Sequence, residues 1–247
     1  MKRTLLTLAA TLLLSTASLC HADQPTPQAN QAFDRYAHTV EARIESTTPR
    51  PTTSTTPVLE KLTPATLPAG LNGSMLHHWR ATVFVPGATA DTFLHLLRDY
   101  RAYPQRFAPQ VTRATVLTDT PDHLVGTLRF RQHHVISVVL DATFDTAIDA
   151  AHGHSFSRST TIREIDSPGT ASEHALSPAD DHGFLWRQNT YWSWQQTNGG
   201  LVLTLETLSL TRDIPSGLGW AVRPFVETIP RESLVFTLTS AANALRR

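Results

Sequence analysis

Two long alternating segments separated by Asn198-Gly199 constrain the fold more than any other feature of this sequence. Residues 184–196 and 201–213 both alternate apolar and polar side chains, as half-buried strands do. An Asn-Gly pair between two such segments is the strongest short hairpin signal, because both residues tolerate the positive φ of a type I′ turn. A turn there pairs Trp192 with Leu205, Trp194 with Leu203 and Tyr191 with Glu206.

The tryptophan face of this hairpin is the better candidate for the concave, interior face of the sheet. An indole left in water would forgo roughly 2 kcal/mol or more of burial free energy. Sparse polar groups on the same face are typical of small-molecule pockets. A packed core with a few hydrogen-bonded polar residues is an equal alternative. The same parity places on this face Leu128, Phe130, Leu140, Phe144, Phe156, Gln188, Thr190, Trp192, Trp194, Leu205 and Thr207.

Further strands are predicted by the same alternation, and helices flank them. With the hairpin they make about seven strands: one strand, then a helix pair that starts near Thr89, then six strands, followed by a long C-terminal helix. Antiparallel strands grouped between helices indicate an α+β fold, a curved antiparallel sheet wrapped on the C-terminal helix. The other strands are expected at 77–85, 111–119, 123–132, 135–147 and 155–166.

Length and charge bound the classes of function. The chain has 247 residues, 40% of them hydrophobic, with a formal net charge of +0. That is enough for one sizeable core, and the balanced charge gives no electrostatic case for nucleic acid. Twelve histidines are present, but the neighbouring pairs His77-His78 and His133-His134 point to opposite strand faces and cannot chelate together. We expect no metal, no cofactor and no marked catalytic motif.

Residues 1–22 are predicted to be a cleaved signal peptide. Lys2 and Arg3 precede an apolar run over 4–19, and cleavage is expected after Ala22. The run is shorter than the ~20 residues that span a bilayer, so a transmembrane anchor is the weaker alternative. Lipidation of Cys20 is another, although Leu19 fits a lipid-attachment motif poorly. The mature protein is expected to be periplasmic or secreted, without stable membrane insertion.

Residues 23–73 are predicted to be a helix followed by a tether. The helix, 29–46, has a thin apolar stripe that needs a partner, and Leu208 and Leu210 on the outer hairpin face could receive it. A bulge that flips the strand's parity is the alternative explanation for these two leucines. The following segment, 46–68, is rich in Thr and Pro and reads as an extended tether. We therefore expect 74–247 to fold without the first 73 residues.

Several local signatures resemble the START-like superfamily of polyketide cyclase and lipid-transport (SRPBCC) proteins, in particular its exported bacterial members. The segments are "DYRAYPQRFAPQV" (99–111), "HHWRATVFVPG" (77–87), "DHGFLWRQNTYWSW" (181–194) and "LSLTRDIPSGLGWAVRPFVETIPRESL" (208–234). The resemblance covers 74–247. It implies a helix-grip fold with a deep cavity between the sheet and the C-terminal helix, which family members use for lipids, polyketides and other apolar molecules.

Within that resemblance, the proline-broken connector closes the cavity. Pro104 and Pro109 end helical runs, and Tyr103 and Phe107 would close the cavity mouth, either as a fixed plug or as a gate. We include both aromatic residues among the ligand-binding candidates, together with Phe225 of the C-terminal helix.

Two functions from different classes remain, with a third behind them. The first is a carrier of a hydrophobic, lipid-like small molecule that performs no reaction; protein partners are not indicated. The second is a cyclase- or hydrolase-like enzyme, in which Arg158 and Glu164 share the face of Phe156 and Ile162 and do acid–base work. The third is an interaction module whose cavity is filled by its own side chains.

Overall fold

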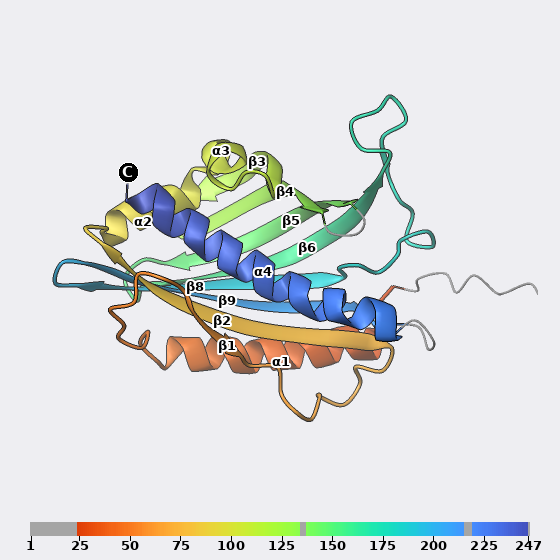
Figure 1. Cartoon of the computed structure of the whole chain (residues 1–247), viewed down its shortest axis with the longest axis horizontal. Helices are drawn as coiled ribbons and strands as arrows, with labels where there is room; N and C mark the ends of the chain where they lie inside the picture. The colour runs from red at the N-terminus through yellow and green to blue at the C-terminus, as the bar shows by residue number, and fades with distance from the viewer. Residues whose placement is uncertain (1–23, 134–136, 215–218, 247) are drawn as a thin grey trace, which may run out of the picture.

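A long curved sheet with a helix on each face forms the body of the protein (Figure 1). The computed structural model describes residues 24–133, 137–214 and 219–246, and only the backbone of 133 and 219–227. The signal peptide predicted over 1–22 lies outside the described residues.

Over the described residues the sheet is antiparallel throughout and has nine strands, two more than expected. The hydrogen-bonded order is β1-β2-β9-β8-β6-β5-β4-β3, with β7 paired to β6 off this path. The two unexpected strands are short: β1 lies within the Thr/Pro-rich segment, and β7 lies in the loop after β6. The bounds are β1 Val58–Lys61, β2 Ser74–Pro86, β3 Val111–Thr120, β4 His123–His133, β5 Ser137–Asp149, β6 His154–Asp166, β7 His174–Ala175, β8 Arg187–Thr197 and β9 Gly200–Arg212.

The predicted β8–β9 hairpin is confirmed in its register. Trp192 pairs with Leu205, Trp194 with Leu203, and the turn falls at Asn198-Gly199. Gly199 has a φ of 90°, the left-handed conformation that this turn requires. The antiparallel β2 flanks β9 on its other side. The hairpin is therefore central in the sheet, as its apolar pattern requires.

The C-terminal helix α4 (Gly219–Leu245) crosses the concave face of the sheet. Its inward side chains Leu234 and Leu238 are buried against that face together with α2 (Ala90–Arg98). Thr89 and Thr92 form a capping box that starts α2 where the sequence predicts it. The short turn Tyr100–Ala102 and α3 (Tyr103–Arg106) lead from α2 into β3. None of the described helices is long and apolar enough to cross a membrane.

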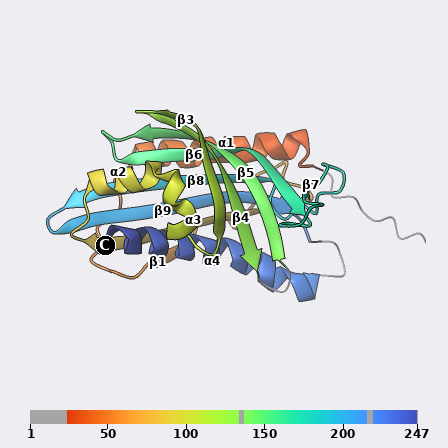
Figure 2. The ribbon, with the colours of Figure 1, turned by 90° about the horizontal axis from the view of Figure 1, so that it is seen from above.

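The N-terminal helix α1 (Pro27–Glu45) packs on the opposite, convex face, which confirms its predicted partners (Figure 2). It forms a second core with the sheet, separate from the core under α4. Thr26 caps the helix through its side chain, and Pro27 occupies the first turn, where its missing N–H costs nothing. The buried members of this second core are Ala29, Ala32, Phe33, Ala37, Val40, Ile44, Leu71, Leu76, Phe156, Tyr191, Leu208 and Leu210.

The segment between α1 and β2 is more than a tether. Val58–Lys61 pairs with β2 and extends the sheet by one edge strand. Phe84 donates a backbone hydrogen bond to the carbonyl of Ser54 (2.7 Å). With α1 docked beside it, residues 24–73 contribute a face and an edge to the folded domain, which weakens the expectation that 74–247 folds without them.

Phe156 lies on the convex face, so its predicted placement on the concave face is wrong. The register between β5 and β6 shifts between Thr143 and Phe144, which pair with Thr161 and Ser159. The extra residue on β6 is Thr160, and such a bulge reverses which side chains face each side. Ile162 beyond the bulge still packs on the concave core, whereas Phe156 before it packs on Tyr191 in the second core.

We predict that Phe33→Ala destabilises the whole protein. Phe33 on α1 is 0% exposed, and the Arg187 guanidinium lies 4.9 Å from its ring centroid. A buried Phe→Ala change costs ~3–5 kcal/mol of unfolding free energy through lost burial and the cavity left behind. Urea unfolding of both proteins measures this. Gln31→Ala, an exposed change on the same helix, is the control, expected to stay within about 0.5 kcal/mol. Equal midpoints for the two variants would mean that α1 does not pack on the sheet.

Candidate ligand-binding face and the buried polar network

The concave face is most tightly packed beside α2. Trp192 and Trp194 project from β8 onto Phe93 of α2. The ring centroid of Phe93 lies 5.1 Å from that of Trp192 and 5.2 Å from that of Trp194. Both tryptophans are buried, and Leu205 opposite Trp192 is 0% exposed. At this end the predicted ligand-binding residues therefore form a close-packed core.

Farther along β8 and β9 the concave face becomes half-buried and more polar. Thr190 and Thr207 pair directly, and both are partly accessible, as is Gln188 next to them. The backbone N–H of Gln188 donates to the Ser159 hydroxyl (2.9 Å). The side-chain Nε2 of Gln188 lies 3.5 Å from the Thr190 hydroxyl. The side chain of Phe225, which was predicted to join this face from α4, is not among those described.

Aromatic and aliphatic side chains of β4 and β5 continue this face. Phe130 is half-buried and meets Phe144 edge to face at 6.0 Å. Leu128, Leu140 and Phe144 are buried. Gln132 reaches from β4 to α4 and donates to the Ser233 hydroxyl (3.0 Å). Of the thirteen predicted residues whose side chains are described, twelve lie on the side of the concave core, and Phe156 faces away.

The aromatic side chains of the connector pack against one another. Tyr103 stacks on Tyr100 at 4.5 Å and meets Phe107 at 4.8 Å, and its hydroxyl donates to the Leu97 carbonyl (2.8 Å). The Tyr100 ring in turn lies on Gly126 of β4, where an added Cβ would come within 2.4 Å of it. Ring contacts, a part-buried hydrogen bond and a close approach to Gly126 therefore surround these aromatics, which stay candidates for closing the cavity mouth.

The charged pair expected in the cavity does not exist. Arg158 precedes the bulge and therefore faces α1, where it donates two 2.8 Å hydrogen bonds to Glu41. Glu164 lies beyond the bulge and accepts from the His182 backbone N–H (3.2 Å), with its other oxygen 3.0 Å from the His182 ring. The prediction that the two residues share a face is wrong for the same reason as that for Phe156.

Sequence reasoning missed a buried polar network on the convex face. Glu206 of β9 is 2% exposed and lies 2.5 Å from Nε2 of His78, which is also 2% exposed. Arg43 of α1 donates to the same carboxylate oxygen, and the Tyr36 hydroxyl lies 2.9 Å from Nδ1 of His78. Glu206 and Arg80 are also direct neighbours in the β2–β9 register. The usable signal was a single carboxylate within β9, the one charged side chain over residues 200–211.

Two pockets lie away from the predicted ligand-binding residues. One, of about 300 Å³, is on the convex side between α1 and β2 and includes Tyr36 and His78. The other, of about 450 Å³, lies where β6 and β8 separate beyond the bulge, and includes Trp186 and Ile162. Within the described residues, no group of three His, Cys, Asp or Glu side chains is arranged to hold a metal ion.

We predict that the tyrosines ionise only as the protein unfolds in alkali. The chain has four tyrosines. Burial is the main cause that raises the pKa of Tyr100 to about 12, and burial likewise raises the pKa of Tyr36, Tyr103 and Tyr191. A free phenol has a pKa of ~10. Because the folded state binds these protons more tightly, their contribution to stability is fully present below a pH of ~10. It is lost as the pH rises from there through the folded-state pKa values.

Ultraviolet absorbance of tyrosinate and far-ultraviolet circular dichroism, followed during one alkaline titration, check this. The two signals should change together, above the pH at which tyrosinate forms in the urea-unfolded protein. Ionisation of one tyrosine near its ordinary pKa with the circular dichroism unchanged would contradict the burial described here.

Comparison with known proteins rests on the fold alone. No protein-family model matches this sequence, and no curated protein does. Among solved structures, the chain is similar to the Zhui aromatase/cyclase from Streptomyces sp. R1128, with a TM-score of 0.51 and 16% identity over 70% of this chain and 95% of that one. It is also similar to a STAR-related lipid transfer protein from Xanthomonas axonopodis, with a TM-score of 0.48 and 18% identity over 76% and 99%. The curved antiparallel sheet, the helix across it and the first of these matches identify the START-like helix-grip fold.

Proposed function

We propose that this protein binds a hydrophobic small molecule between the concave face of the sheet and α4, as a carrier that performs no reaction. The observation that carries the proposal is the change along that face from fully buried leucines to half-buried Thr190, Thr207, Gln188 and Phe130. Small-molecule sites combine mainly apolar walls with a few polar groups that orient the ligand. The half-buried stretch has this composition.

The packed end and the aromatic connector support the same proposal. Trp192, Trp194 and Phe93 fill the space beside α2, while Tyr103 and Phe107 fill the space at the connector. A bound molecule is therefore expected against the half-buried stretch, between β4 and the first half of α4. The aromatase/cyclase similarity supports the fold of this site and leaves the ligand open.

We propose further that the protein acts after export, in the periplasm or outside the cell. This rests on the basic start and short apolar run of residues 1–22. Removal of that segment would also remove Cys20, the one cysteine of the chain, so the mature protein would carry no thiol. The enzyme alternative keeps no specific support, because it depended on Arg158 and Glu164 facing the ligand together.

Palmitate titration of two matched Phe→Ala variants tests the binding proposal. Palmitate quenching of tryptophan fluorescence gives its affinity, because Trp192 and Trp194 lie beside the proposed site. Phe130→Ala removes a half-buried ring at the site, and we expect about tenfold weaker binding, equivalent to ~1.4 kcal/mol. Its loss of unfolding free energy should be smaller than that of a fully buried phenylalanine.

Phe33→Ala is the matched control, because it removes a ring on the opposite face. It should lower unfolding free energy and leave palmitate affinity unchanged under conditions where the variant is folded. If Phe130→Ala costs as much stability as Phe33→Ala and palmitate binds both equally or not at all, the concave face is a packed core. The interaction-module reading would then replace the carrier.

A further inference from the structure

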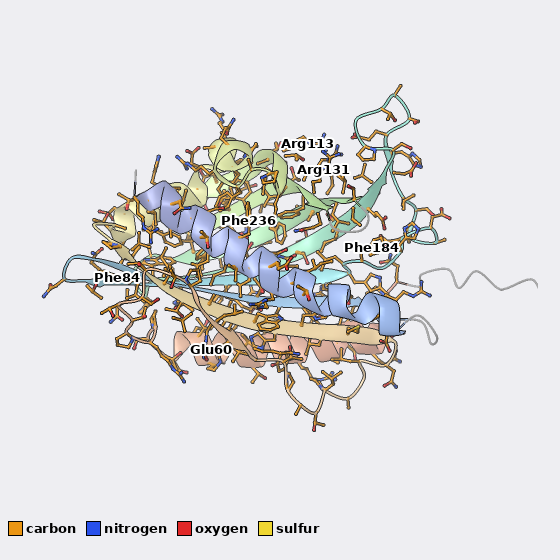
Figure 3. The ribbon with its side chains drawn as sticks, in the orientation of Figure 1. Glu60, Phe84, Arg113, Arg131, Phe184 and Phe236 are labelled. Atoms are coloured by element: carbon orange, nitrogen blue, oxygen red, sulfur yellow. The ribbon has the colours of Figure 1, made fainter. Side chains whose placement is uncertain are left out.

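The convex face carries a pocket that has no place in the proposed carrier function. It lies between α1, β2 and the segment that follows β1, on the side of the sheet away from α4 (Figure 3, near Glu60). Its volume of about 300 Å³ is at the lower end of the range for small-molecule sites. The side chains around it are Tyr36, Thr39, Val40, Arg43, Leu62, His78 and Arg80.

The lining combines cations, hydrogen-bond donors and two aliphatic side chains. Arg43 and Arg80 supply the positive charge, and Val40 and Leu62 supply the apolar surface. Among the described lining residues there is no carboxylate. Glu206 and Glu60 hold the two guanidinium groups, and neither belongs to the pocket wall. The wall therefore presents two guanidinium groups, whose charge Glu206 and Glu60 largely balance, beside an apolar surface.

Glu206 and Glu60 hold the two guanidinium groups in place and leave some of their N–H donors for another partner. Arg43 donates through Nη2 to Glu206, and its side chain is 37% exposed. Arg80 donates through Nη2 to Glu60 (2.8 Å), while its Nη1 is 3.9 Å from Glu206. A guanidinium carries five N–H donors in a fixed fork, so one such bond orients it without exhausting it. Oriented forks of this kind suit a carboxylate.

His78 and Tyr36 form the back wall. Nε2 of His78 lies 2.5 Å from a Glu206 carboxylate oxygen, and Nδ1 lies 2.9 Å from the Tyr36 hydroxyl. Burial and the Glu206 charge raise the pKa of Tyr36, so that its hydroxyl stays protonated. Both ring nitrogens are thus satisfied within the protein, and the anion-binding charge comes from the two arginines.

We propose that this pocket binds a small organic carboxylate with a short aliphatic chain. The carboxylate lies between Arg43 and Arg80, and the chain lies against Val40 and Leu62. Three of these residues come from segments before β2, so the site exists because α1 is docked on the sheet. It is separate from the concave face, and either site can be present without the other.

Isothermal titration calorimetry of the full mature chain with butyrate tests the proposal. Butyrate should bind, inorganic phosphate should bind at least tenfold more weakly because it has no apolar part, and butanol should not bind. Leu62→Glu places a competing carboxylate in the pocket and should weaken butyrate binding at least about tenfold. Leu62→Gln, the neutral control of similar size, should weaken it about threefold through lost apolar contact.

These variants leave Arg43, Arg80 and Glu206 unchanged, so α1 should stay docked; an unchanged thermal midpoint confirms this. Equal butyrate affinity in Leu62→Glu and Leu62→Gln would overturn the proposal, and so would tighter binding of phosphate than of butyrate. Palmitate affinity at the concave face should be the same in both variants. A failure of the carrier proposal is therefore distinguishable from a failure of this one.

Discussion

Burial of β9 on both faces is the constraint on which the rest of this structure depends. Leu203 and Leu205 face α4 and α2, and Leu208 and Leu210 face α1; all four are 0% exposed. A central strand of this kind needs a covering layer on each side, because leaving either set of leucines in water would forgo several kcal/mol. The helix-grip arrangement supplies only the α4 layer. The second layer is α1, which the chain brings to the convex face before the sheet begins.

Glu206 favours one docked position of α1 in that second layer. A buried carboxylate is strongly destabilising when it lacks partners, by about 3–5 kcal/mol where a pair is broken by removing one member. His78 supplies one partner from the neighbouring strand, and Arg43 supplies another from α1. The docked helix thus provides a positive charge that the interior of the sheet needs. Apolar burial favours docking, and the buried charge favours one particular docked position.

The sequence predicted the fold where one local pattern is decisive. It failed where a bulge reverses the faces of a strand without changing the types of its residues. The β8–β9 register followed from Asn198-Gly199 and strict alternation, and the partners of α1 followed from two leucines left over on the outer face. The reversal at Thr160 was invisible, because Phe156 and Ile162 are both apolar and both faces of β6 are covered. A bulge leaves the number of apolar residues in a strand unchanged and alters only which of the two cores each residue enters.

The edge strand β1 and the convex pocket were missed for a related reason. Four residues within a Thr/Pro-rich segment carry too little pattern to identify a strand, and β1 forms because β2 offers an unpaired edge. The pocket depends on Arg43 of α1, Arg80 of β2 and Leu62 of the segment after β1, whose proximity only the tertiary fold determines. Charged residues of this kind read as solvated surface in a sequence, since most of them are.

Three ion pairs, spread along α1, hold the helix in position on the sheet. Asp34 accepts from Arg187 (2.7 Å), Glu41 from Arg158 (2.8 Å), and Arg43 donates to Glu206. An apolar stripe alone would tolerate sliding of the helix, because its small side chains repeat. A shift by one turn would separate all three pairs and leave Glu41 buried without its counter-charge. Glu206 would lose Arg43 and keep only His78 and Arg80 of β2 beside it. The chain segment outside the shared fold is therefore held in a single register by charge, and that register is what brings Arg43 beside Arg80 at the convex pocket.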